Sequence, residues 1–127
     1  MQPAVSVVAG KLYVAGGNSG GGAAINRVDV YNPATSSWST AAAMPTARVG
    51  AAGVLAGGRL YVIGGRNGTT YLNTVEVYDP LSNSWSTASM PLTRGALGAG
   101  VVSGSIYALG GRNASTGALS NNERFTP

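Results

Sequence analysis

The sequence of 127 residues contains no cysteine and no histidine, and it carries few charges. The absence of both residue types excludes disulfides, zinc sites of the usual kinds, and catalysis by a cysteine or histidine side chain. Charged residues make up 9% of the chain, against roughly 25% in average proteins. Because hydrophobic residues reach 44%, the low charge predicts close packing of small side chains and not disorder.

The charges that are present are mainly positive and mainly arginine. Eight Lys or Arg residues against four Asp or Glu residues give a net charge of +4, and seven of the eight cations are arginine. A planar guanidinium pairs with carboxylates or phosphates in a fixed geometry, so this usage favours defined sites. A dense basic stripe is absent, and we therefore expect no nucleic-acid partner.

Targeting segments are not recognisable in the sequence. No stretch is long and apolar enough to cross a bilayer, and the N-terminus lacks the basic and apolar regions of a signal peptide. We therefore expect no membrane partner. The compartment stays open, with a cytoplasmic location as the default expectation.

A repeat of about 47 residues organises the chain. Trp38 and Trp85 are 47 residues apart, each within an identical Ser-Trp-Ser-Thr segment. A glycine doublet with a tyrosine three positions before it occurs three times, at Gly16-Gly17, Gly64-Gly65 and Gly110-Gly111. An aromatic residue, any residue and a proline follow each doublet, at 31–33, 78–80 and 125–127. Repeats of this length predict stacked units that bury their apolar faces against one another.

Each repeat is predicted to contribute up to four short strands. In the second repeat the apolar runs, the alternating segment and the turn residues between them predict strands at 49–56, 59–63, 74–78 and 84–89, with a polar loop at 66–70. The first repeat also supplies four strands, and the third supplies three. Helical periodicity is absent.

The glycine doublet, the tyrosine and the tryptophan, at these offsets, resemble the kelch repeat over essentially the whole chain. The resemblance implies an all-β fold of β-propeller blades with four antiparallel strands each. The predicted blades are residues 1–45, 46–91 and an incomplete third blade at 92–127.

An arc of fewer than three blades cannot close a ring, because propellers have about four to eight blades. Open blade faces and unpaired strand edges drive association. Two chains together would supply six blades, so we expect a homodimer in which each chain forms half of a propeller. The alternative is a fragment of a longer chain that associates promiscuously, and both descriptions can hold together.

Arginines are predicted to gather at one rim of the ring. Arg48 and Arg94 precede the first strands of two blades, Arg66 and Arg112 follow the second strands, and antiparallel strands bring these ends together. In kelch-like domains that bind peptides, arginines at these two places often line a shallow central pocket where acidic segments dock. The resemblance implies the same role for these four arginines. The candidate ligand-binding residues are Arg48, Arg66, Asn67, Arg94, Arg112, Asn113 and Asn18, the last taking the place of an arginine in the first repeat. The alternative is that the arginines bond to carbonyls of neighbouring loops and brace the blades.

The acidic and aromatic residues are predicted to be structural. Asp29, Glu76 and Glu123 recur at one position of the third strand, where a buried acid must be paired, and we expect a repeat arginine as partner across a blade interface. Trp38 and Trp85 recur once per repeat, which favours a core between blades. Tyr71 has no counterpart in the other repeats, so it is a candidate for a surface contact.

The hypothesis favoured by these patterns is a non-catalytic interaction and assembly module without a cofactor. Its arginine rim would bind acidic peptides or small anions. One alternative is a fragment or engineered building block without any ligand. Another is a piece of a kelch-like enzyme of the sugar-acid isomerase type, which would need a carboxylate on the arginine rim; a copper oxidase is excluded because it needs histidine.

Overall fold

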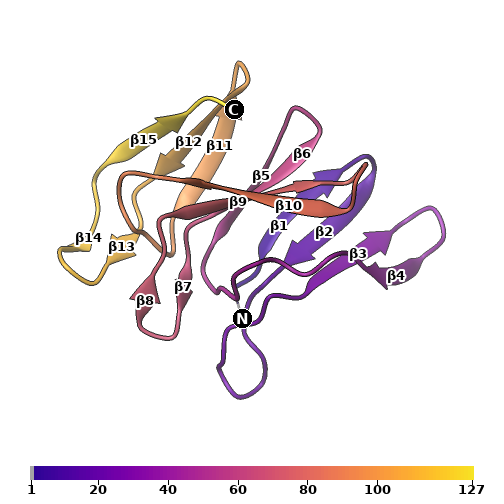
Figure 1. Ribbon diagram of the computed structural model, residues 1–127, viewed down its shortest axis with the longest axis horizontal. Coiled ribbons are helices and arrows are strands. Elements are labelled where there is room, and N and C mark those ends of the chain that lie inside the picture. Colours follow the sequence, from indigo (N-terminus) through magenta and orange to yellow (C-terminus); the bar gives the residue numbers. More distant parts are fainter. Residues whose placement is uncertain (1) are drawn as a thin grey trace.

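The computed structural model describes residues 2–127, and the regular elements in that range are all β-strands (Figure 1). The first sheet contains β1 (Ala4–Val8), β2 (Lys11–Ala15), β3 (Val28–Asn32) and β4 (Ser37–Thr40), in that order. The second sheet contains β5 (Ala52–Ala56), β6 (Arg59–Ile63), β9 (Thr74–Asp79) and β10 (Ser84–Ser89). The third contains β11 (Gly98–Val102), β12 (Ser105–Leu109) and β15 (Asn122–Phe125). Two short hairpins complete the fold, β7 (Arg66–Asn67) with β8 (Thr70–Tyr71) and β13 (Arg112–Asn113) with β14 (Gly117–Ala118).

These strands confirm the all-β prediction of antiparallel sheets with four, four and three strands. The predicted strand 49–56 begins only at Ala52, because Val49 instead forms an isolated bridge with Arg66. The predicted loop 66–70 contains the β7–β8 hairpin. The predicted start of the first blade, at residue 1, lies outside the described residues.

The three sheets stack through small apolar side chains. Alternate residues of a strand face opposite sides of its sheet. The second sheet therefore packs one set of side chains on the first sheet and the other set on the third. Between the first and second sheets, Val28, Leu60 and Val62 are fully buried. Between the second and third sheets, Ile63, Val75 and Ile106 are at most 2% exposed. The innermost strands are β1, β5 and β11, and Gly53 of β5 lies so close to Ala4 and Val5 that a Cβ atom there would be 3.1 Å from the Val5 amide nitrogen.

A series of main-chain hydrogen bonds joins the three sheets at one end. The Gly50 amide donates to the Gln2 carbonyl at 2.9 Å, and the Ala96 amide donates to the Gly50 carbonyl at 2.8 Å. The loop after β2 and the hairpins β7–β8 and β13–β14 project at the lower-left side of the molecule (Figure 1). The repeat therefore brings equivalent loops of the three sheets to the same rim, as the strand directions predict.

The glycine doublet Gly64-Gly65 ends β6 where another segment passes very closely. Gly64 has φ of +63°, and a Cβ atom at this position would overlap the carbonyl oxygen of Arg94. The Gly65 amide donates to that same carbonyl at 2.8 Å. Glycine is required here because it allows a positive φ and leaves room for a neighbouring backbone.

The two outer faces of the stack carry exposed apolar side chains. On the first sheet Val7 and Trp38 are 57% and 61% exposed. On the third sheet Val102 and Leu109 are 63% and 44% exposed. Within the single chain Trp38 therefore does not lie between blades, because its sheet has a neighbour on the opposite face only. Trp85 does lie between sheets, since its indole nitrogen donates to the Ala42 carbonyl at 2.8 Å.

Candidate functional site

Arg48 lies inside the protein and not on the rim surface. Its exposed fraction is 0%, and its Nη1 atom donates to the carbonyls of Gly64 at 2.8 Å and Thr74 at 3.1 Å. Its Nη2 atom donates to Thr74 Oγ1 at 2.9 Å and pairs with Glu76 Oε2 at 2.8 Å. Burial lowers the pKa of the Arg48 guanidinium, and the Glu76 carboxylate partly offsets this effect. The expectation of an accessible ligand-binding Arg48 is therefore corrected: the side chain ties the end of β6 to the start of β9.

Arg94 repeats this arrangement in the third sheet and is likewise 0% exposed. Its Nη1 atom donates to the carbonyls of Gly110 at 2.8 Å and Asn121 at 3.0 Å, and Nη2 lies 3.2 Å from Glu123 Oε2. The expectation of an accessible Arg94 is corrected for the same reason. In both cases the bracing alternative describes the observed contacts, because each guanidinium donates to main-chain carbonyls at both ends of the loop between the second and third strands of its sheet.

All four acidic residues are paired with arginines. Glu76 and Glu123 pair with the repeat arginines, which confirms the predicted pairing, although each pair lies within one predicted blade and does not cross an interface. Asp29 pairs with Arg27 at 2.7 Å and Asp79 with Arg59 at 3.4 Å, both at the surface. The net charge of +4 therefore resides on the four cations without a carboxylate partner in residues 2–127: Lys11, Arg66, Arg112 and Arg124.

Two of those four cations line one cavity, which we call the rim hollow. It has a volume of about 450 Å³, and its lining includes Val49, Arg66, Thr69, Tyr71, Gly95 and Arg112. The backbone of each arginine is fixed by a reciprocal pair of hydrogen bonds. Arg66 exchanges two bonds of 2.9 Å with Val49, and Arg112 exchanges two bonds of 2.9 Å with Gly95. The rim hollow therefore presents two exposed guanidinium groups from anchored main-chain positions.

The predicted asparagines do not line the rim hollow. Asn67 is exposed in β7, and Asn18 is half-buried at an isolated bridge to Ala24. Asn113 is 9% exposed, and its Oδ1 atom accepts hydrogen bonds from the Ser115 amide, the Thr116 amide and the Thr116 hydroxyl. This oxygen organises the β13–β14 turn and is already occupied.

Tyr71 is a residue of the rim hollow that the predicted site set did not include. Its ring lies against Gly95, where a Cβ atom would be 3.2 Å from two ring carbons. The available signal was its lack of a counterpart in the other repeats. The backbone pairing of Val49 and Gly95 with the loop arginines carried no comparable signal, because it depends on how the rim loops close.

The described residues offer little for other chemistry. Within residues 2–127 no three His, Cys, Asp or Glu side chains come together in a way that could hold a metal ion. Burial raises the pKa of the Tyr78 phenol, with further contributions from Tyr13 and Asp79, so the hydroxyl stays protonated and donates to Asn83 Oδ1 at 2.7 Å. No helix in the described part of the chain is long and apolar enough to span a bilayer.

The fold and its repeated ion pairs define a class of protein built from stacked, four-stranded antiparallel blades. A family model described as the KLHDC2/KLHL20/DRC7 Kelch-repeats domain matches residues 2–125. The chain therefore belongs to this kelch-repeat family, as the sequence resemblance predicted. No curated protein sequence matches it. Kelch repeats generally mediate protein binding, and the family is generally non-catalytic.

Proposed function

We propose that this chain is a protein-interaction module whose rim hollow binds an acidic peptide segment or a small carboxylate. The observation that carries the proposal is the pairing of Arg66 and Arg112 in one cavity, while all four carboxylates of the chain are engaged elsewhere. An exposed guanidinium can take a carboxylate through two parallel hydrogen bonds. The anchored backbones reduce the ordering cost of binding.

Arg66 also has an internal partner that a ligand would displace or share. Its Nη1 atom donates to the Gly68 carbonyl at 2.8 Å within the β7–β8 turn. Other donors of the same guanidinium remain available, because arginine has five N–H groups. The paired state of the carboxylates also argues against catalysis, since no rim acid is left to act as a base in the described residues.

The test compares two double variants with equal loss of charge. Arg66→Gln with Arg112→Gln removes both guanidinium groups of the rim hollow, and we expect the affinity for a hexaglutamate peptide to fall by about tenfold or more. The measurement is isothermal titration calorimetry at fixed salt concentration.

The matched control is Lys11→Gln with Arg59→Gln. These residues are exposed at equivalent positions, the starts of β2 and β6, which lie at the opposite strand ends from the glycine doublets. We expect less than about a twofold change in affinity, since exposed charges at a distance are screened by salt. Equal losses in the two double variants would refute a specific site at the rim hollow.

We also propose that two copies associate into a closed ring of six blades. The supporting observation is the pair of apolar outer faces. One contains Val5, Val7 and Trp38 of the first sheet, and the other contains Val102, Tyr107 and Leu109 of the third. In the repeat, the open face of the third sheet is equivalent to the face of the second sheet that packs on the third sheet. A second copy would thus continue the same stacking. In one chain the Gly50 amide donates to the Gln2 carbonyl and the Ala96 amide donates to the Gly50 carbonyl, and Gln2 of the second copy would take the next position in this series.

Light scattering after size exclusion, over a dilution series, tests this association. We expect a species of 25.2 kDa, which is twice the 12.6 kDa of one chain. Leu109→Glu should yield the monomer mass, because it places a charge in the proposed contact. Leu81→Glu is the control: Leu81 is 97% exposed in the β9–β10 turn, away from both faces, and should leave the dimer intact. A monomer in the unchanged chain would refute the ring.

A further inference from the structure

The tip of the β7–β8 hairpin contains Asn67 followed by Gly68, and no other asparagine of the sequence precedes a glycine. Asn67 pairs with Thr70 across the hairpin, so Gly68 and Thr69 form the turn between the two strands. Residues 66–70 are all exposed. A Cβ atom on Gly68 would have no neighbouring atom within 4 Å. The space around this turn is therefore open to solvent.

An asparagine side chain and the main-chain amide that follows it form a reactive pair. The Gly68 nitrogen attacks Cγ of Asn67, and the new N–Cγ bond closes a succinimide ring. The bond from Cγ to Nδ2 breaks, and the amide proton leaves with Nδ2 as ammonia. Water then opens the ring at one of its two carbonyls, which gives aspartate or isoaspartate. The whole reaction consumes one water and releases one ammonia, so it needs no oxidant and no second protein.

The hairpin tip offers little resistance to this attack. Glycine has no side chain that would hinder the approach to its nitrogen. Within residues 2–127 the Gly68 amide donates no hydrogen bond, and the Asn67 side chain is likewise unbonded. Ring closure requires the tip to leave its extended conformation. A strand of two residues without buried apolar contacts opens at low cost.

The β13–β14 hairpin contains the protected counterpart, Asn113. It is 9% exposed, and its Oδ1 atom accepts hydrogen bonds from the Ser115 amide and from the amide and hydroxyl of Thr116. These bonds hold the side chain away from the following nitrogen. Ala114 comes next, and its methyl group hinders the attack. The two hairpins of the rim therefore differ in this chemistry at the same place after a rim arginine.

The reaction would place a negative charge beside the rim hollow. Both products carry a carboxyl group, which is ionised at neutral pH. Arg66 precedes the reacting residue, and its Nη1 atom donates to the Gly68 carbonyl at 2.8 Å. Isoaspartate also adds one carbon to the main chain before Gly68, which displaces this acceptor. Both the charge and the internal hydrogen bond of Arg66 would therefore change.

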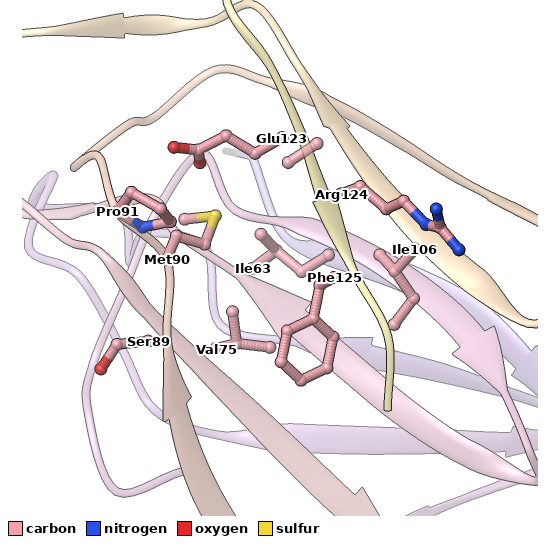
Figure 2. A pocket seen from close by; sticks show the side chains of 10 residues that line it. Ile63, Val75, Ser89, Met90, Pro91, Ile106, Glu123, Arg124 and Phe125 are labelled. Atoms are coloured by element: carbon pink, nitrogen blue, oxygen red, sulfur yellow. The ribbon is translucent and has the colours of Figure 1, made fainter.

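The unpaired cations outside the rim hollow are not placed to receive this carboxylate. Arg124 belongs to β15, and Figure 2 shows its side chain pointing away from Phe125 and toward the edge of the view. Its Nε atom donates to Ser105 Oγ at 3.3 Å. Lys11 begins β2, at the opposite strand ends from the glycine doublets. The new charge would thus act mainly on Arg66.

We propose that Asn67 is a site of spontaneous deamidation and that its products weaken the binding of acidic ligands at the rim hollow. The first part stands independently, and the second rests on the proposed function. The new carboxylate attracts the Arg66 guanidinium and repels the carboxylates of a ligand. Affinity for acidic ligands therefore falls as the molecule ages.

The first test follows conversion in the folded full chain at neutral pH by tryptic digestion and mass spectrometry. Trypsin releases peptides 67–94 and 113–124, so both asparagines are read in one sample. Fragmentation locates the mass increase and separates aspartate from isoaspartate. We expect conversion at Asn67 to be at least about tenfold faster than at Asn113, because glycine follows only the first. Equal rates would overturn the proposal, and so would conversion at Asn67 about tenfold slower in the folded chain than in urea.

The second test measures the affinity for hexaglutamate by calorimetry before and after the same incubation. The deamidated chain should bind about threefold more weakly. Asn67→Gln keeps an amide but closes a succinimide far less readily, so this variant should retain its affinity. An equal loss in Asn67→Gln, or unchanged affinity of a fully deamidated chain that binds when fresh, would overturn the second part. Absence of binding to the fresh chain would instead refute the proposed function and with it the second part, while conversion measured at Asn67 would still establish the modification site.

Discussion

Replacing Arg48 by methionine is expected to lower the free energy of unfolding by about 3–5 kcal/mol. The substitution keeps an unbranched side chain of comparable length, so it removes the charge and its bonds with little change of shape. It leaves the Glu76 carboxylate, 1% exposed, without its countercharge. It also leaves the Gly64 and Thr74 carbonyls without the donor that Arg48 supplies. Urea unfolding followed by tryptophan fluorescence measures the loss.

Two further methionine variants make this prediction specific to burial. Arg59→Met breaks the exposed pair with Asp79, whose atoms are 3.4 Å apart, and should cost at most about 1 kcal/mol. Arg94→Met should fall between the two, because Glu123 is more exposed and farther from its partner than Glu76. If the Arg48→Met protein is too unstable to study, the order of Arg94→Met and Arg59→Met still decides. Equal losses in these two variants would contradict a structural role for the buried guanidinium groups.

Replacing Gly64 by alanine is expected to cost about 2–4 kcal/mol, from backbone strain and overlap together. The residue has φ of +63°, and the new Cβ atom would meet the Arg94 carbonyl oxygen, which is main chain and cannot rotate away. Thermal unfolding should therefore occur at a clearly lower temperature than in the unchanged chain.

Gly57→Ala separates the two contributions. Gly57 has φ of +56°, close to that of Gly64, but no atom lies within 4 Å of its added Cβ. This variant therefore reports strain alone and should cost about 1 kcal/mol. If both glycine variants lost the same stability, the close passage of the Arg94 carbonyl would not be what requires glycine at the end of β6.

Much of the fold could be predicted because the repeated motifs mark where equivalent strands begin and end. The strand β6 has the bounds expected from the run 59–63, and β10 those expected from 84–89. The error at 49–56 has a local cause. An apolar run gives no sign of where the chain changes from pairing with a neighbouring strand to pairing with a loop, and Val49 pairs with Arg66.

The sequence predicts that the arginine loops meet at one rim, but it does not reveal which of their side chains are exposed there. Strand directions bring four arginines to one end of the sheets, but they do not reveal which side chains turn inward. That choice depends on the partner available: Arg48 reaches a glutamate and two carbonyls, whereas Arg66 reaches only the Gly68 carbonyl of its own turn. Arg48 and Arg66, which lie near each other in the fold, therefore differ in exposure: the Arg48 side chain is buried and the Arg66 side chain is exposed.

The buried ion pair has an evolutionary consequence. Arg48 and Glu76 both belong to one unit of about 47 residues, and so do Arg94 and Glu123. A duplication or deletion of a whole unit therefore transfers both charges together and never strands one inside the protein. Asp29, by contrast, is partly exposed and pairs with the nearby surface residue Arg27. Because each such unit contains both members of its buried ion pair, the number of units in a gene can change by recombination without a compensating mutation in the neighbouring unit.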